Sequence, residues 1–131
     1  MKKELAIIQI LTAPEGGGAE FLGRELAKEM ANMNYESYVI YFSNKNRVEL
    51  NKGEILLGNF NPRDFRNYLL LRKKIYRLKK IYKKIILHAH LTWPLYYTSL
   101  IKSTDSIKKI YTEHNTHNKR RNIPLLKYIE R

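Results

Sequence analysis

Short apolar runs recur along this chain, and polar segments of helical or turn character separate each run from the next. The first run, Leu5–Leu11, is almost continuously apolar and rich in Ile, which is typical of a strand buried on both faces of a parallel sheet. The same reasoning predicts further strands at Tyr38–Phe42, Glu54–Leu57, Ile85–His90 and Ile107–Tyr111. Because parallel strands need a crossover between them, this pattern confines the chain to the α/β class.

The segments between these runs predict the helices. In Ala19–Met33 the apolar residues Phe21, Leu26 and Met30 share one face, and charged residues occupy the other. Further helices are expected at Thr92–Lys102, at Ile123–Arg131 and at Arg63–Lys83, the last with Asn61 as its cap and Pro62 in its first turn. We therefore expect residues 1–131 to form one Rossmann-like, doubly wound parallel sheet.

The positive charge of the chain is concentrated in its second half. Overall, 25 Lys and Arg residues outnumber 12 Asp and Glu residues, which gives a net charge of +13. Residues 1–60 hold 7 basic and 8 acidic residues, net −1, whereas residues 61–131 hold 18 basic and 4 acidic residues, net +14. This asymmetry indicates an anionic partner: a membrane, a nucleic acid or a phosphorylated substrate.

The helix expected at Arg63–Lys83 carries much of this charge. Its basic face is either a binding surface or a face that is only exposed to solvent. Its basic residues flank an apolar stripe, which is the pattern of a helix that lies on anionic lipid. RNA is less favoured, because single strands are held by clustered exposed aromatic side chains that this segment lacks. The candidate membrane-surface residues are Arg72, Lys73, Lys74, Arg77, Lys79, Lys80, Lys83 and Lys84.

The composition excludes several other classes of protein. Without cysteine the chain has no disulfides, no thiolate metal ligands and no cysteine nucleophile. The apolar run near the N-terminus is too short for a bilayer-spanning helix, and it leads into glycines rather than a signal-peptide cleavage site. We therefore expect a cytoplasmic protein.

Three distinctive segments follow expected strands, at the edge where ligands bind in open α/β sheets. They are Gly16–Gly18, His88–His90 and Thr112–His114. The glycines lead into a helix N-terminus, whose free N–H groups favour phosphate. They match neither the dinucleotide-binding fingerprint nor a P-loop, so a tight turn without a ligand is the alternative.

Four histidines in the second half raise the question of a metal site. His88 and His90 are two residues apart and therefore point to one side of a strand, and His114 and His117 follow the neighbouring strand. Glu113 is the only carboxylate near them in the sequence, and their spacings are not those of a zinc pair, so no metal is expected. We expect His88 to be packed deeper in the sheet and His90 to make polar contacts at the strand end.

Four segments carry a resemblance to a known family: T-A-P-E-G-G-G-A-E at residues 12–20, H-A-H at 88–90, Y-T-E-H-N-T-H-N at 111–118 and Y-I-E-R at 128–131. In this order the chain resembles the N-terminal domain of family-4-like glycosyltransferases of the GT-B fold, over nearly its whole length. The resemblance implies two Rossmann-like domains that face each other across a cleft. It also implies retaining transfer of a hexosyl unit from a nucleotide-sugar to an envelope or cell-surface glycan or lipid-linked acceptor, without a metal or other resident cofactor.

The resemblance further implies roles for individual residues. These are His90 as the catalytic residue at the transferred sugar; Gly16, Gly17 and Gly18 at the donor diphosphate; Thr112 and His114 on the floor of the cleft; and Arg120 and Arg121 at an anionic acceptor. Members with such acceptors often dock on the inner face of the plasma membrane through basic surfaces of this domain, in agreement with the basic second half. Nucleic acid is not an expected partner.

Two expectations concern what the chain does by itself. The family's C-terminal nucleotide-sugar domain is absent, and no two Glu residues here are eight positions apart as that domain requires. We therefore expect residues 1–131 to be a partial N-terminal domain, inactive alone and completed by a C-terminal domain in cis or in trans. The alternative is a non-catalytic basic α/β module that binds anionic membrane lipid or RNA.

Overall fold

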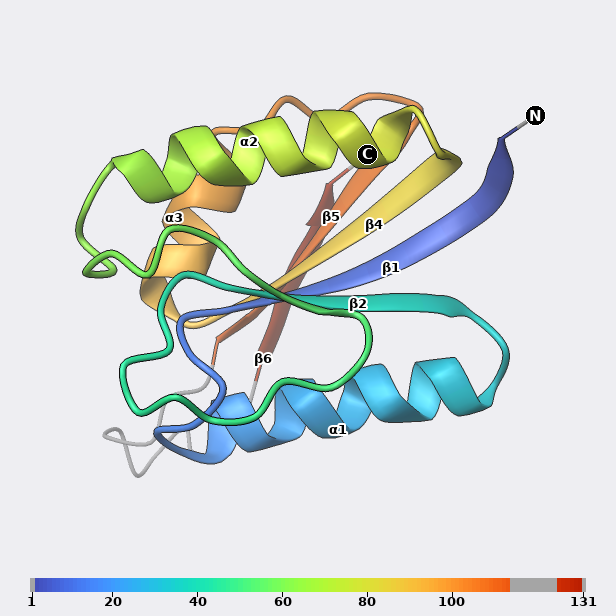
Figure 1. The fold of residues 1–131 in the computed structure, drawn as a ribbon. Helices are drawn as coiled ribbons and strands as arrows, with labels where there is room; N and C mark the ends of the chain where they lie inside the picture. Colours follow the sequence, from blue (N-terminus) through green and yellow to red (C-terminus); the bar gives the residue numbers. More distant parts are fainter. Residues whose placement is uncertain (1, 114–124, 131) are drawn as a thin grey trace.

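The computed structural model describes residues 2–113 and 125–130, which form a single sheet with helices on both faces (Figure 1). The strands are β1 (Lys3–Leu11), β2 (Glu36–Tyr41), β3 (Glu54–Leu56), β4 (Tyr82–His90), β5 (Ile107–Glu113) and β6 (Leu125–Glu130), in the order β3-β2-β1-β4-β5-β6. Strands β1 to β5 are parallel, and β6 is antiparallel to β5. The parallel part confirms the Rossmann-like expectation, because the strand order reverses direction at β1.

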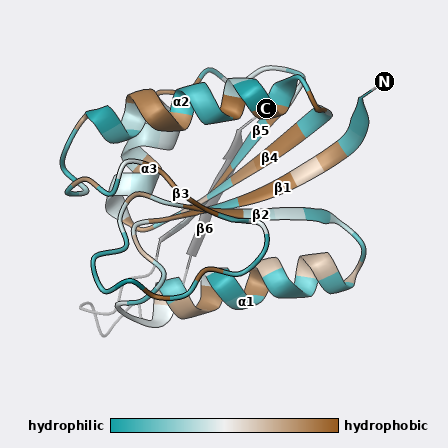
Figure 2. Ribbon diagram, viewed as in Figure 1, coloured by the Kyte–Doolittle hydropathy of each residue, from teal (hydrophilic) through white to brown (hydrophobic). Residues whose placement is uncertain are grey.

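The helices make two outer layers. Helix α1 (Gly18–Asn32) covers one face of the sheet, and α2 (Arg66–Lys79) and α3 (Thr92–Ser99) cover the other (Figure 1). Because successive strand residues face opposite sides, Ile8 and Ile10 pack in the larger core with α2 and α3, while Leu11 packs with Ala27 of α1. Figure 2 shows this pattern as hydrophobic colour along the central strands and alternating bands along the helices.

Helix α1 lies unusually close to the sheet at Gly23. A Cβ added to Gly23 would lie only 2.8 Å from side-chain carbons of Leu11 on β1. A residue with a side chain would therefore push the helix outward or force Leu11 to move. Gly23 thus sets the distance between α1 and the sheet, and with it the position of the glycine loop that precedes the helix.

A buried ion pair ties α1 to β3. Arg24 of α1 donates two hydrogen bonds to the carboxylate of Glu54, at 2.7 Å from Nε and 2.6 Å from Nη2. Tyr41 of β2 donates its hydroxyl to the same carboxylate, and the backbone N–H of Asn51 adds a bond of 2.6 Å. The side chains of Arg24 and Glu54 are only 19% and 5% exposed, so little water screens the pair.

The pKa of Glu54 reflects this environment. Burial pushes the pKa of the Glu54 carboxyl upward, but the hydrogen bonds from Arg24, Tyr41 and Asn51 outweigh it and leave the pKa below its usual range. Burial and the bond to Glu54 raise the pKa of the Tyr41 hydroxyl, which therefore stays protonated as a donor. The cluster holds three elements, α1, β2 and β3, in one arrangement.

The bounds predicted for the helix at Arg63–Lys83 are wrong at both ends. It begins at Arg66, because Asn61–Asp64 forms a separate turn in which the Asp64 N–H donates to the Asn61 carbonyl at 2.9 Å. The Asn61 side chain accepts from the N–H of Arg63 in that turn instead of capping the helix. The helix ends at Lys79, because Tyr82 already belongs to β4, where it pairs with Lys3 of β1.

The segment that ends the chain also differs from the expectation. The sequence predicts a helix at Ile123–Arg131, whereas Leu125–Glu130 forms β6 against β5. Without β6, the outer N–H and C=O groups of β5 would lack partners, and pairing with a further strand satisfies them. A leucine-rich segment after a proline fits a helix or a strand equally well by pattern, so the open edge of β5 decides between them.

Within residues 2–113 and 125–130, no helix has both the length and the apolar character needed to cross a bilayer.

Candidate functional site

The expected segments meet at one edge of the sheet, as parallel pairing requires. Strands β1, β4 and β5 are neighbours, so the glycine loop after β1, His90 at the end of β4 and Thr112 of β5 all lie at their carboxyl ends (Figure 1). His90 is the register partner of Thr112, and the preceding Ala89 is the partner of Ile10. The convergence expected from the sequence is therefore confirmed for the described members.

Four polar side chains form a contact chain across these strands. His90 donates from Nε2 to Oε1 of Gln9 at 2.7 Å, and Nε2 of His88 is hydrogen-bonded to the hydroxyl of Thr112 at 2.6 Å. The two imidazole rings lie against each other, with centroids 4.1 Å apart. We call Gln9, His88, His90 and Thr112 the histidine cluster; it joins β1, β4 and β5 on the face that α1 covers.

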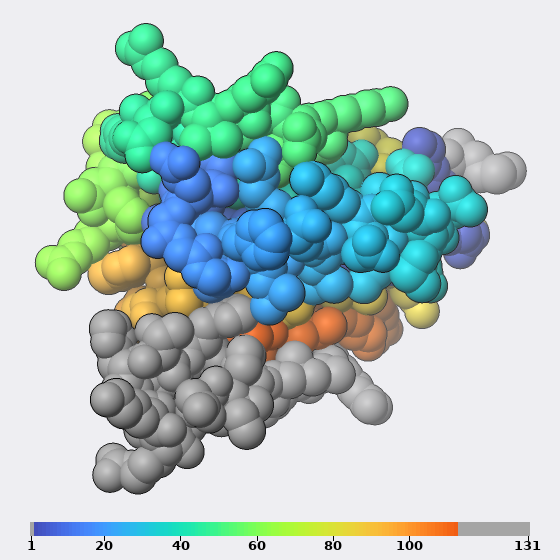
Figure 3. Space-filling view, turned by 90° about the horizontal axis from the view of Figure 1, so that it is seen from below, coloured from blue at the N-terminus to red at the C-terminus, as the bar shows by residue number. Residues whose placement is uncertain are grey.

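The burial of the two histidines reverses the expectation. His90, placed at the mouth by the sequence argument, is only 1% exposed, whereas His88 is partly exposed. Depth along the strand does not set exposure here, because His90 leans toward Gln9 in the middle of the sheet. His88 leans toward Thr112 of β5, which α1 leaves less covered (Figure 3).

Gln9 is a site residue that the sequence argument missed. It is 1% exposed, and its side-chain Nε2 has no hydrogen-bond partner among the described residues, while Oε1 accepts from His90. A buried amide with one half unpaired costs free energy, which favours a role that requires it. The available signal was a single polar residue in the otherwise apolar run Leu5–Leu11.

The turn after His90 is strained. Leu91 has φ of 71° and ψ of −177°, a backbone region that residues with side chains rarely adopt. This turn ends β4 and starts α3 at Thr92 within one residue. Strain of this kind costs about 1–3 kcal/mol and gathers at functional sites, and nothing about a leucine would have predicted it.

The glycine loop leads into α1 as expected. Gly16 has φ of 140°, which requires glycine, and α1 starts at Gly18. The carboxylate of Glu20 faces this loop, since a Cβ on Gly17 would lie 3.4 Å from its Oε1. Burial raises the pKa of Glu20, and a bond from its own backbone N–H only partly offsets this.

A hollow of about 250 Å³ lies beside the glycine loop. Its lining includes Gly16, Gly17 and Phe21, and it continues along α1 to Arg24 and Lys28. None of the histidine cluster lines it. Within the described residues, the glycine loop and the histidine cluster therefore share an edge of the sheet, and this hollow belongs to the glycine loop.

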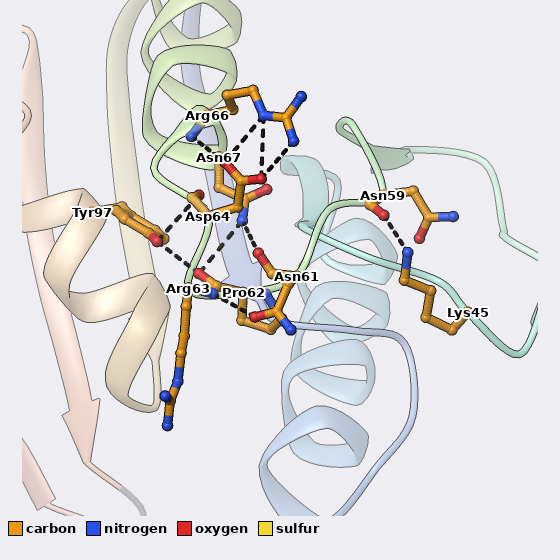
Figure 4. Close-up of polar contacts among 9 residues, drawn as sticks. All are labelled: Lys45, Asn59, Asn61, Pro62, Arg63, Asp64, Arg66, Asn67 and Tyr97. Carbon is orange, nitrogen blue, oxygen red and sulfur yellow. Dashed lines mark hydrogen bonds and ion pairs between the residues drawn. The ribbon is translucent and has the colours of Figure 1, made fainter.

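The loop before α2 is fixed at the same edge by a polar network (Figure 4). Asn67 is fully buried and donates from Nδ2 to the Asn61 carbonyl at 2.8 Å, and Tyr97 of α3 donates its hydroxyl to the Pro62 carbonyl at 2.6 Å. Asp64 is paired with Arg66 at 2.7 Å. Figure 4 shows the Arg63 side chain pointing away from this network.

The candidate membrane-surface residues divide between two elements. Six of them lie on α2 or directly after it, and most of these are exposed; they are Arg72, Lys73, Lys74, Arg77, Lys79 and Lys80. Lys83, expected at the end of the helix, lies with Lys84 on β4, and Lys83 pairs with Glu4 at 2.9 Å. The helical residues alternate with exposed Leu69 and Tyr76. Sequence reasoning noted Tyr76 only as a weak stacking residue and did not single out Leu69.

Several predicted residues lie outside the part that the structure describes. They are His114, His117, Arg120 and Arg121. Within the described part, no three His, Asp or Glu side chains gather in a way that could hold a metal ion.

Comparison with known proteins identifies the family of this chain. A search of curated proteins found no match. A sequence model of the family described as Glycosyltransferase Family 4 matches residues 16–131, from the glycine loop to the end of the chain. Together with the Rossmann-like sheet, this match shows an N-terminal, GT-B-like glycosyltransferase domain: the chain belongs to glycosyltransferase family 4.

Proposed function

We propose that this chain is the acceptor-side half of a retaining glycosyltransferase that moves a hexosyl unit from a nucleotide-sugar to an envelope or cell-surface glycan or lipid-linked acceptor. The observation that supports it most is the histidine cluster at the carboxyl edge, next to a glycine loop that opens α1. The nucleotide-sugar is a co-substrate, and the proposal includes no resident metal or cofactor.

The proposed chemistry divides between the loop and the cluster. The N-terminus of α1 and the open backbone of Gly16–Gly18 suit a diphosphate, because free N–H groups and the helix dipole favour negative charge there. The hydrogen bond between His90 and Gln9 fixes the orientation of the His90 imidazole ring toward the transferred sugar.

The remaining roles belong to groups beyond the described residues. His114 would complete the floor of the cleft beside Thr112, and Arg120 and Arg121 would meet an anionic acceptor. A C-terminal domain, in cis or in trans, would hold the nucleotide and supply the groups that stabilise the leaving diphosphate. Residues 1–131 alone would then be inactive.

We also propose that α2 rests on an anionic membrane surface, on the inner face of the plasma membrane. Leu69, Arg72, Tyr76 and Lys80 follow one another at spacings of three or four and are all exposed, so they form a stripe that we call the outer face of α2. Basic residues near anionic lipid contribute about 1 kcal/mol each, and exposed apolar side chains add burial in the headgroup region.

The catalytic proposal is tested with His90→Ala. Cells that lack the native gene are complemented with wild type or variant, and their extracts are assayed for transfer of radiolabelled hexose from a panel of nucleotide-sugars to endogenous lipid and glycan acceptors. We expect the variant to lose at least about 100-fold in transfer, the scale of one well-placed catalytic group.

The control is Tyr35→Ala, an exposed residue outside the carboxyl edge. It should leave transfer unchanged, and thermal melts of both variants separate loss of activity from loss of folding. Unchanged turnover with His90→Ala removes His90 from the site. If no sugar is transferred by wild type while the protein binds anionic vesicles or RNA in a salt-sensitive way, the chain is a binding module instead.

A further inference from the structure

A groove separate from the carboxyl-edge site lies between α2 and β3. It has a volume of about 240 Å³ and is lined by aliphatic residues of β3 and its continuation together with residues of α2. In the described part of the chain, β3 is the outermost strand on its side of the sheet, so the groove opens at a free sheet edge (Figure 1).

The floor of the groove is aliphatic. Ile55, Leu57 and Leu70 line it, and all three are only partly buried although Ile55 and Leu57 also pack against the main core. Apolar side chains left partly exposed in a concave surface are the usual lining of a site for an apolar ligand. No aromatic residue lines the groove, which disfavours stacked bases.

The rim of the groove is cationic. Lys73, Lys74 and Arg77 line it on the α2 side. Among the described residues, none of the three has a carboxylate partner, whereas Arg66 and Lys83 are paired with Asp64 and Glu4. Three uncompensated positive charges beside an aliphatic floor complement a molecule that has an anionic head and an apolar tail.

We propose that this groove binds a single anionic phospholipid, with its phosphate at Lys73, Lys74 and Arg77 and part of one acyl chain on the aliphatic floor. The volume of about 240 Å³ lies below that of pockets that enclose a whole drug-sized ligand, so the groove suits a chain segment and not a whole lipid. The inference rests on the proposed membrane docking and deepens it. Docking through the outer face of α2 requires only contact with the bilayer surface as a whole, whereas the groove adds one stoichiometric lipid site.

The test uses the full chain and dihexanoyl phosphatidylglycerol below its critical micelle concentration, titrated by calorimetry. We expect saturable binding of one lipid per chain, and at least about tenfold weaker binding by dihexanoyl phosphatidylcholine, by glycerol phosphate and by inorganic phosphate. Sedimentation with phosphatidylcholine vesicles, with and without phosphatidylglycerol, measures membrane docking in parallel.

Two matched triple variants distinguish lipid binding in the groove from attraction by the net positive charge of the protein. Replacing Lys73, Lys74 and Arg77 with Gln should weaken short-chain lipid binding at least about tenfold. Replacing Arg72, Lys80 and Lys84 with Gln removes the same charge outside the groove and should change this binding less than about twofold, although vesicle binding falls. Leu70→Ser tests the floor and should remove the advantage of the dihexanoyl lipid over glycerol phosphate.

Each outcome has one meaning. Equal loss in both triple variants, or absent saturable binding while vesicles still bind, overturns the groove and leaves membrane docking in place. Equal affinity for glycerol phosphate and the lipid reduces the site to an anion site and overturns the acyl-chain assignment. Absence of all vesicle binding by wild type overturns the membrane proposal itself, and the transfer assay with His90→Ala remains a separate test of catalysis.

Discussion

Removal of the guanidinium that neutralises Glu54 should leave an unpaired buried charge, because Arg24 and Glu54 form the least exposed ion pair among the described residues. In Arg24→Met the aliphatic stem of the side chain is retained, but both hydrogen bonds to Glu54 are lost. The carboxylate, 5% exposed in the native protein, then keeps only the Tyr41 hydroxyl and the Asn51 N–H as donors.

The expected loss of stability follows from this geometry. Breaking a buried ion pair by removing one partner costs about 3–5 kcal/mol, because a buried charge is left uncompensated. The two remaining donors place this case at the lower end, about 3 kcal/mol. The control is Lys28→Met, which removes an ion pair with Glu25 whose side chains are 56% and 47% exposed, and which should cost less than about 1 kcal/mol.

The loss should also depend on pH. In the native protein the pKa of Glu54 lies below its ordinary value, so its contribution is present above the ordinary carboxyl pKa and is lost as pH falls through the folded value. In Arg24→Met, burial becomes the main influence and raises the pKa of Glu54, so protonation relieves the unpaired charge. The deficit of the variant should therefore be largest near pH 7 and shrink toward pH 4.

The assay is urea unfolding followed by the fluorescence of Trp93, the only tryptophan. At pH 7, Arg24→Met should lower the urea midpoint by at least about 1 M. The double variant Arg24→Met with Glu54→Gln carries no buried charge and should recover to within about 1 kcal/mol of wild type. A deficit under about 1 kcal/mol at pH 7, or one that is equal at pH 4, would refute the reasoning.

Glycine substitutions test the loop and the distance between α1 and the sheet by thermal melts. Gly16→Ala should cost about 1–2 kcal/mol because φ is 140°, whereas Gly18→Ala, with no atom within 4 Å of the added Cβ, should be neutral or stabilising by about 0.5 kcal/mol; the opposite order would contradict the loop geometry. Gly23→Ala should cost about 1–3 kcal/mol because its Cβ meets Leu11 at 2.8 Å. A Gly23→Ala variant more stable than wild type, as helix propensity alone predicts, would show that α1 does not pack this closely.

The sequence was sufficient for the five parallel strands β1 to β5 and for the family. The strand predicted at Leu5–Leu11 matches β1 to within two residues at each end, because a strand buried on both faces must be apolar throughout. Helix α1 is predicted within one residue at each end, since glycines precede it and its apolar spacing is regular. The meeting of the glycine loop, His90 and Thr112 follows from the same pattern, because parallel neighbours end at one edge.

Tertiary structure decided what local pattern leaves open. Tyr82 fits the apolar stripe of a helix, but its pairing with β1 and the bond of its hydroxyl to Tyr38 at 2.6 Å make it a strand residue. Leu125–Glu130 becomes a strand because β5 has an edge to satisfy. Periodicity is a property of neighbouring residues, whereas an open edge exists only after distant strands have assembled.

The same distinction holds for the candidate site. The sequence alone named His88 and His90 and placed them on one side of a strand, because strand geometry fixes that relation. Which of the two is buried, and that Gln9 holds His90, depended on residues about eighty positions away in the chain. Local sequence therefore determined which chemical groups reach the edge of the sheet, and packing between distant segments determined how each is oriented, because orientation depends on contacts that no single segment contains.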